Sequence, residues 1–233
     1  MNPPAGVSTP HAGPDLAVNG RDDRPRVEKT SGKRFRVLEY TVLIVLAVAA
    51  AFLIKAFVFQ VFVVPSGSME PTIKPGERLL VEKVSALAST PSRGEVWVFD
   101  GAGLFTDPGP GEHVFVKRII GVGGDHVVCC NAQGQLEING VPLVEDYLPA
   151  GTVASKERFN VEVPADSVWV MGDDRDHSAD SRAYIGMPGG GFIPTDRMIG
   201  RAVAVAWPVS SLRTVSTPVA FDALVNSTSA TTH

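Results

Sequence analysis

The most conspicuous pattern in the chain is an apolar run close to its N-terminus. Residues 40–54 contain no charged side chain, and apolar residues dominate beyond Lys55 as far as residue 64. A helix that crosses a bilayer needs about 20 predominantly apolar residues. We therefore predict a transmembrane helix over residues 37–57, with the Lys55 ammonium group reaching the far interface. A core helix of a soluble protein is the alternative, and the apolar character of the whole helix circumference disfavours it.

The pattern changes to that of β-strands after residue 64. Short segments rich in β-branched and aromatic residues alternate with Gly and Pro, at residues 78–84, 95–99, 113–121, 126–129, 159–163, 167–171 and 199–207. Residues 135–143 are typical of a hairpin, because Asn139-Gly140 favours a tight turn. A sustained helical period is missing after residue 64. The sequence therefore predicts a mainly β domain of antiparallel sheets over residues 58–209.

The two ends of the chain differ from this domain in composition. Residues 1–36 are rich in Pro, Gly and Asn and carry seven Lys/Arg against four acids, which leaves +3 on this head and −7 on the rest. We expect a disordered basic head on the cytoplasmic side, because basic residues next to a membrane helix stay there. The domain after the helix would then lie outside the cytoplasm, in a single-pass arrangement. Residues 210–233 are rich in Ser, Thr and Ala and are predicted to be a flexible tail.

Charge and cysteine content narrow the choice of function. The net charge of −4 disfavours a nucleic-acid binder, which needs a basic surface. The two cysteines, Cys129 and Cys130, are neighbours. We interpret them as free thiols at the end of a strand, with a vicinal disulfide or an intermolecular bridge as alternatives. With His126 they do not complete the four ligands of a structural zinc site.

A hydroxyl-rich turn directly after the apolar run offers a candidate nucleophile. Residues 65–72 read Pro-Ser-Gly-Ser-Met-Glu-Pro-Thr, which places Ser68 close to the end of the helix. A serine needs a neighbouring base to become an effective nucleophile. The Gly-x-Ser-x-Gly and Ser-x-x-Lys patterns are both missing at Ser68, since Pro71 stands at the lysine position. Among the five histidines, His177 is the plausible base.

Lys117 is a better candidate base because of its surroundings. It lies within the apolar strand-like segment 115–120, and burial of an ammonium group lowers its pKa by up to about 3–5 units. Arg118 would point to the opposite face of the strand, so the two cations need not share a pocket. Taken alone, Lys117 is equally a strand lysine whose ammonium group reaches solvent. A third segment, residues 172–182, reads Gly-Asp-Asp-Arg-Asp-His-Ser-Ala-Asp-Ser-Arg and concentrates charge in the same way.

These three segments, in this order, resemble the bacterial type I signal peptidases over roughly residues 35–209. That resemblance implies a membrane-anchored serine endopeptidase whose mainly β core is shared with the self-cleaving repressors of the SOS response. It implies cleavage of exported preproteins after a small-x-small site, typically Ala-x-Ala, without a metal or cofactor. It also implies a bacterial plasma-membrane location, with the lipid bilayer as a partner and the secretion translocase as a further candidate partner.

The resemblance assigns roles to individual residues. Ser68 matches the nucleophile and Lys117 the general base, while Ser66 and the Ser68 backbone N–H match the oxyanion hole. Ser178 matches a serine that orients the lysine. Four charged residues match family residues that support the site through ion pairs: Asp173, Asp180, Arg182 and Arg118. We expect Arg118 to pair with Asp173. The alternative for these charges is a solvated loop.

Two positions depart from the family pattern. His177 stands where the family commonly has Asn, and Glu70 stands where it commonly has Met. We interpret His177 as a hydrogen-bonding loop residue, with an auxiliary base as the alternative, and Glu70 as an acid that would raise the Lys117 pKa. The competing functions are a catalytically silent, membrane-tethered β binding module and a related self-cleaving Ser-Lys peptidase. The latter is disfavoured by the apolar span and by the lack of a basic domain.

Overall fold

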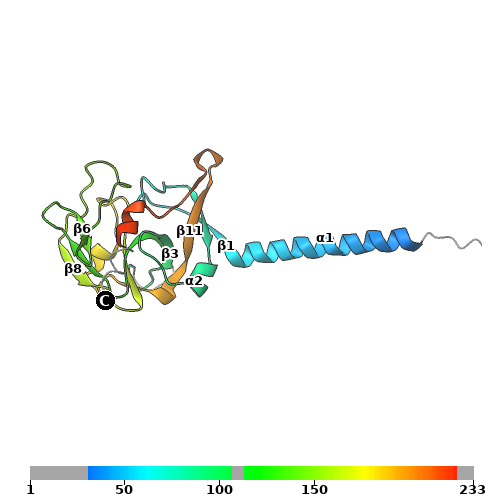
Figure 1. Cartoon of the computed structure of the whole chain (residues 1–233), viewed down its shortest axis with the longest axis horizontal. Helices are drawn as coiled ribbons and strands as arrows, with labels where there is room; N and C mark the ends of the chain where they lie inside the picture. Colours follow the sequence, from blue (N-terminus) through cyan, green and yellow to red (C-terminus); the bar gives the residue numbers. More distant parts are fainter. Residues whose placement is uncertain (1–30, 107–112, 225–233) are drawn as a thin grey trace, which may run out of the picture. The chain divides into compact units, whose positions relative to one another are not determined.

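The computed structural model describes residues 31–106 and 113–224, so most of the predicted disordered head, residues 1–30, lies outside it. Helix α1 (Ser31–Val58) contains a segment, Phe35–Leu53, that is long and apolar enough to cross a bilayer (Figure 1). The helix is longer at both ends than the predicted residues 37–57. Its apolar side chains over Phe35–Leu53 are not covered by protein. The predicted position of the Lys55 ammonium group lies outside the described side chains.

The larger sheet holds eight strands joined by antiparallel pairing. Along the sheet the order is β1-β2-β11-β3-β4-β9-β10, and β12 pairs with β11. The bounds are β1 Phe59–Val63, β2 Arg78–Glu82, β3 Val96–Asp100, β4 Val114–Val122, β9 Ser167–Met171, β10 Ile193–Pro194, β11 Met198–Trp207 and β12 Arg213–Thr214. Neighbours in the sheet thus include strands far apart in the chain, such as β2 and β11.

The smaller sheet has four strands in the order β7-β6-β5-β8. Its strands are β5 His126–Cys129, β6 Leu136–Ile138, β7 Val141–Pro142 and β8 Phe159–Glu162. The predicted hairpin turn lies between β6 and β7, where Asn139 and Gly140 have φ values of 55° and 77°. Both residues thus adopt the left-handed conformation that a two-residue hairpin turn requires, and that Asn-Gly tolerates.

Helices are short in this domain, and the central strands of the larger sheet are buried on both faces. Val96 and Val98 of β3 pack into one apolar cluster, while Trp97 and Phe99 pack into another. Trp169 of β9 belongs to a third cluster and is fully buried. Helix α2 spans Val84–Ala88, and single turns of 3-10 helix occupy η1 Ser181–Tyr184, η2 Thr195–Arg197, η3 Val209–Ser211 and η4 Val219–Phe221. Strand β4 lies between β3 and β9, so a side chain at its centre is enclosed.

Two expectations differ from the structure. The predicted flexible tail, residues 210–233, contains structure in its described part: β12 pairs with β11, and Phe221 and Leu224 are buried. Residues 225–233 of this tail lie outside the described residues. The Ser/Thr-rich composition of this segment favours the prediction of a flexible tail, because only a few apolar residues, such as Phe221 and Leu224, pack against the domain. Cys129 and Cys130, interpreted as free thiols, are instead joined to each other by a disulfide at the end of β5.

Candidate active site

Ser68 lies in a compact turn between β1 and β2. Met69 and Ile73 fix this turn, because both side chains are fully buried and the Ile73 N–H donates to the Met69 carbonyl at 2.9 Å. The turn closes further through the Glu70 N–H, which donates to the Gly67 carbonyl at 2.9 Å. Ser68 itself is 9% exposed, and it lines a groove together with Lys117.

Lys117 approaches Ser68 from the centre of β4. It pairs across the sheet with Trp97, is 3% exposed, and its Nζ lies 2.5 Å from Ser68 Oγ. Burial lowers the pKa of Lys117 from 10.5 to about 8. The charge of Asp180 acts in the opposite direction and raises this pKa, and the charge of Arg182 lowers it again. An appreciable fraction of Lys117 is therefore neutral near pH 8 and can accept the proton of Ser68.

Arg118 follows Lys117 on β4, and its side chain binds Asp173 in residues 172–182, which we call the catalytic loop. Its Nε and Nη2 donate to the two Asp173 carboxylate oxygens at 2.8 and 2.6 Å, and its Nη1 donates to the Gly94 carbonyl at 2.7 Å. Thr72, in the Ser68 turn, donates to the same Asp173 carboxylate at 2.5 Å. The expected Arg118–Asp173 pair thus also connects residues 172–182 to the turn that holds Ser68.

Gly172 is the point where the catalytic loop meets Ser68. A methyl group on Gly172 would overlap the Ser68 carbonyl oxygen and the Ser178 hydroxyl, so only glycine fits between them. The Asp174 N–H donates to the Ser68 carbonyl at 3.1 Å, and the Gly172 N–H donates to Asp180 at 2.9 Å. The backbone on either side of Asp173 is thereby fixed against the nucleophile.

The Asp180 carboxylate also pairs with the buried Arg182, whose Nε and Nη2 lie 2.8 Å from its two oxygens. Ser178 differs from its expected role. Its Oγ is buried next to Gly172, and no hydrogen bond joins it to Lys117 in the described part of the chain. Burial raises the pKa of the Asp180 carboxyl, but Arg182, the Gly172 N–H and the nearby Ser178 hydroxyl together hold this pKa below its usual value.

The remaining predicted residues lie at the rim of the site. Ser66 Oγ is 3.3 Å from Ser68 Oγ and is exposed, as expected for a hydroxyl that can turn toward a substrate oxygen. His177 is exposed, and its Nδ1 lies 3.0 Å from an Asp174 carboxylate oxygen, which fits a loop hydrogen bond rather than contact with Ser68. The exposed Glu70 carboxylate lies near Gly67.

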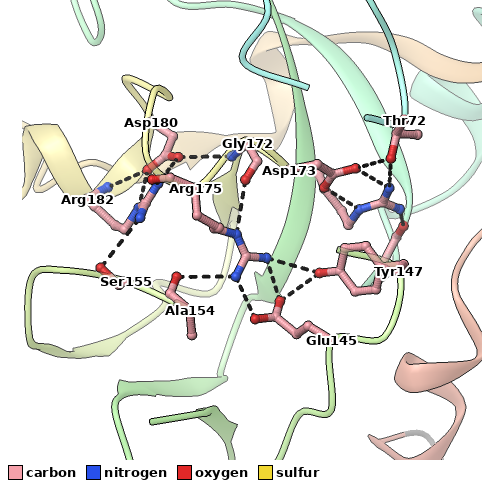
Figure 2. A network of polar contacts seen from close by, with 12 residues as sticks. Thr72, Glu145, Tyr147, Ala154, Ser155, Gly172, Asp173, Arg175, Asp180 and Arg182 are labelled. Carbon is pink, nitrogen blue, oxygen red and sulfur yellow. Dashed lines mark hydrogen bonds and ion pairs between the residues drawn. The ribbon is translucent and has the colours of Figure 1, made fainter. Parts of the chain in front are cut away.

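The structure adds four residues that the sequence did not single out for the site: Thr72, Glu145, Tyr147 and Arg175. Figure 2 shows their side chains in one polar network with Asp173, Asp180 and Arg182. Arg175 belongs to the third motif, but the sequence gives no partner for it. Glu145 and Tyr147 lie about 30 residues earlier in a polar loop, where nothing in the sequence distinguishes them from solvated surface residues. Within the described residues, acids, histidines and cysteines do not gather into a metal-binding cluster.

Comparison with known proteins identifies the family of this site. Residues 37–207 match the family model described as signal peptidase, peptidase S26. The chain belongs to this family. All the residues that surround Ser68 and Lys117 lie inside the matched region. The chain is therefore a member of a serine endopeptidase family, and its mostly antiparallel β-sheet architecture is the one expected for it.

Relatives from several bacteria support the same assignment. A signal peptidase I from Mycobacterium tuberculosis is 34% identical, over 85% of this chain and 82% of the relative. A signal peptidase I from Bacillus amyloliquefaciens is 37% identical, over 80% of this chain and 96% of the relative. A solved signal peptidase I structure from Enterococcus faecalis is 25% identical with a TM-score of 0.37, and covers 48% of this chain and 97% of that chain. The assignment rests on the family match and the curated relatives.

Proposed function

We propose that this member of the signal peptidase family is a membrane-bound endopeptidase. It would remove N-terminal signal peptides from exported preproteins after a small-x-small site, with Ser68 as nucleophile and Lys117 as general base. The observation that carries this proposal is the separation of 2.5 Å between Lys117 Nζ and Ser68 Oγ, with the lysine 3% exposed. A lysine that touches a serine in a dry site has its pKa lowered toward the working pH, as a general base requires.

A groove beside Ser68 supports a peptide substrate. It has a volume of about 450 Å³ and is lined by residues 61–66, 68–69 and 114–117. Strand β1 is an edge strand, and residues 114–117 of β4 extend beyond the part of β4 that pairs with β9. An extended peptide can therefore add to these strand edges through main-chain hydrogen bonds, the mode known as β-augmentation. Most of the lining side chains are apolar, which suits the small apolar residues that we propose next to the cleaved bond.

The chemistry follows from the positions of four groups. Neutral Lys117 takes the proton of Ser68 Oγ, which attacks the scissile carbonyl carbon. The Ser68 N–H and the Ser66 hydroxyl donate to the resulting oxyanion, and each such donor contributes roughly 3–4 kcal/mol. The protonated Lys117 gives its proton to the departing amine of the mature protein, which leaves the signal peptide as an ester on Ser68. Lys117 then deprotonates a water molecule that hydrolyses this ester.

Membrane tethering is the second part of the proposal. Phe35–Leu53 has a mean hydropathy of 2.0, and the basic residues Lys33, Arg34 and Arg36 lie at its start. We propose that it spans the plasma membrane once, with the N-terminus in the cytoplasm and the β domain outside. Phe57 and Phe59 are exposed at the start of that domain, which fits contact with lipid.

Cleavage of a purified preprotein in detergent micelles tests the proposal. The wild-type enzyme should cut an Ala-x-Ala preprotein directly after the second Ala, as read by mass spectrometry of both products, and Ser68→Ala should not cut. A second preprotein with a bulky side chain at the last position before the cut should remain intact. Cutting of both preproteins alike, or cutting by Ser68→Ala, would contradict the proposal. Protease treatment of spheroplasts should degrade the β domain but spare an N-terminal tag, which tests the topology.

A further inference from the structure

The loop between β7 and β8 reaches from the smaller sheet to the catalytic loop. Glu145 of this loop accepts two hydrogen bonds from the Arg175 guanidinium, each 2.5 Å long. Tyr147 donates to the Glu145 carboxylate at 2.7 Å and accepts from Arg175 at 3.0 Å. The Ala154 carbonyl accepts from Arg175 at 3.2 Å. Four oxygen atoms from three residues of one loop thus surround a single cation, as Figure 2 shows.

Arg175, which Glu145 binds, also forms a hydrogen bond with the backbone next to Ser68. Its Nε donates to the Gly172 carbonyl at 3.0 Å, and Gly172 is the residue wedged between the Ser68 carbonyl and Ser178. The Arg175 carbonyl in turn accepts from Arg182 at 3.0 Å. A shift of the Arg175 side chain would therefore move the peptide that abuts Ser68, and a shift of its backbone would move the arginine that pairs with Asp180.

Tyr147 also contacts Arg118, the arginine that binds Asp173. Its ring lies 4.7 Å below the Arg118 guanidinium, in a cation–π contact. Arg118 is the partner of Asp173. The loop therefore contacts both arginines that bind residues 172–173. The Glu145 carboxylate binds Arg175, and the face of the Tyr147 ring contacts Arg118.

The buried arginines of the site are equal in number to the buried carboxylates only when Glu145 is included among the carboxylates. Three arginines, Arg118, Arg175 and Arg182, face three carboxylates, Asp173, Asp180 and Glu145, in pairs whose side chains are all at most 8% exposed. Two of the carboxylates come from the catalytic loop itself, and Glu145 is the third. Without it these three buried arginines would face only two carboxylates, which leaves one uncompensated positive charge in surroundings where solvent screens little.

We propose that Glu145 is a positioning residue of the active site. Its carboxylate fixes Arg175, so that Arg175 holds the Gly172 peptide in the place that sets the Ser68 nucleophile against Lys117. This inference deepens the proposed function and rests on it. Glu145 touches neither the substrate nor the reacting atoms, so its effect passes through Arg175 and through the charge balance.

The test compares Glu145→Gln with Glu145→Asp and Asp146→Asn in the full-length enzyme in detergent. Asp146 is the exposed neighbour, and its variant makes the same change of charge at the surface of the same turn. We would measure kcat and KM on the Ala-x-Ala preprotein from pH 6 to 10, with the folded fraction of each variant from circular dichroism. Glu145→Gln should lower kcat by about tenfold or more with little change in KM. The inflection of its kcat/KM profile should also move to lower pH, by roughly half a unit.

The other variants separate positioning from mere stability. Glu145→Asp keeps the charge and should return the inflection to its wild-type pH, and Asp146→Asn should behave as wild type. A Glu145→Gln enzyme with wild-type kcat, or one whose rate falls only with its folded fraction while the inflection stays, would overturn the inference. If Glu145→Gln does not fold, the Tyr147→Phe variant provides the test. A kcat two- to fivefold lower than that of the wild type would support the proposed positioning of Arg175 by this loop, and a wild-type kcat would overturn it. A wild-type enzyme that does not cut contradicts the proposed function instead.

Discussion

The neutral fraction of Lys117 should govern how activity depends on pH. With a pKa of about 8, lowered from 10.5 by burial, Lys117 is about 10% neutral at pH 7 and half neutral at pH 8. An unperturbed lysine would be only about 0.03% neutral at pH 7, so burial raises the population of the base roughly 300-fold. The protonated form is inactive as a base, so activity is lost as the pH falls through about 8. The ratio kcat/KM should rise about tenfold from pH 6 to 7 and about fivefold from pH 7 to 8, and then level.

The assay is cleavage of a preprotein without titratable groups near the cut site, followed from pH 6 to 10. The free enzyme's pKa appears in kcat/KM, and circular dichroism at each pH checks that the enzyme stays folded. An inflection near pH 6.5 would point to a histidine base and refute the reasoning. A rate that still rises beyond pH 10 would show that burial does not lower the Lys117 pKa.

Three further substitutions test separate parts of the site. Gly172→Ala should lower the cleavage rate more than about 100-fold and destabilise the fold by about 1–3 kcal/mol, because its methyl group overlaps the Ser68 carbonyl; normal cleavage would contradict the close fit. Ser66→Ala should reduce kcat by about 100-fold without moving the pH inflection, and an unchanged kcat would exclude Ser66 from the oxyanion hole. Asp173→Asn leaves Arg118 buried without its counter-charge and should cost about 3–5 kcal/mol in urea unfolding, so an unchanged midpoint would refute the structural role.

The sequence predicts the fold best where a repeating pattern exists. Short segments rich in β-branched and aromatic residues predict strands such as β9 and β5 at the bounds they have in the structure, and the residues Asn139-Gly140 predict their turn. β12 escaped notice because it is two residues long, and its pairing partner in β11 lies about ten residues earlier. Such short elements depend on tertiary contacts rather than on local pattern.

Some of the residues that the structure brings together are visible in the sequence, and others are not. Ser68 and Lys117 stand out because a hydroxyl-rich turn and a charged residue in an apolar strand are locally unusual. Glu145 does not stand out, because a carboxylate in a polar loop is common, and its partner Arg175 lies 30 residues away. The role of such a residue becomes visible only when the fold buries it against a specific cation.

The most direct test of the central claim, that Lys117 is the base for Ser68, compares cleavage of an Ala-x-Ala preprotein by the wild type, Lys117→Ala and Lys117→Arg. Lys156→Ala serves as the control, since that lysine pairs with Asp176 at the surface. Our account predicts cutting by the wild type and the control only. Lys117→Arg should be inactive although it keeps the charge, because arginine cannot release its proton near neutral pH. Cutting by Lys117→Ala at a rate comparable to that of the wild type would contradict the dyad and direct attention to His177.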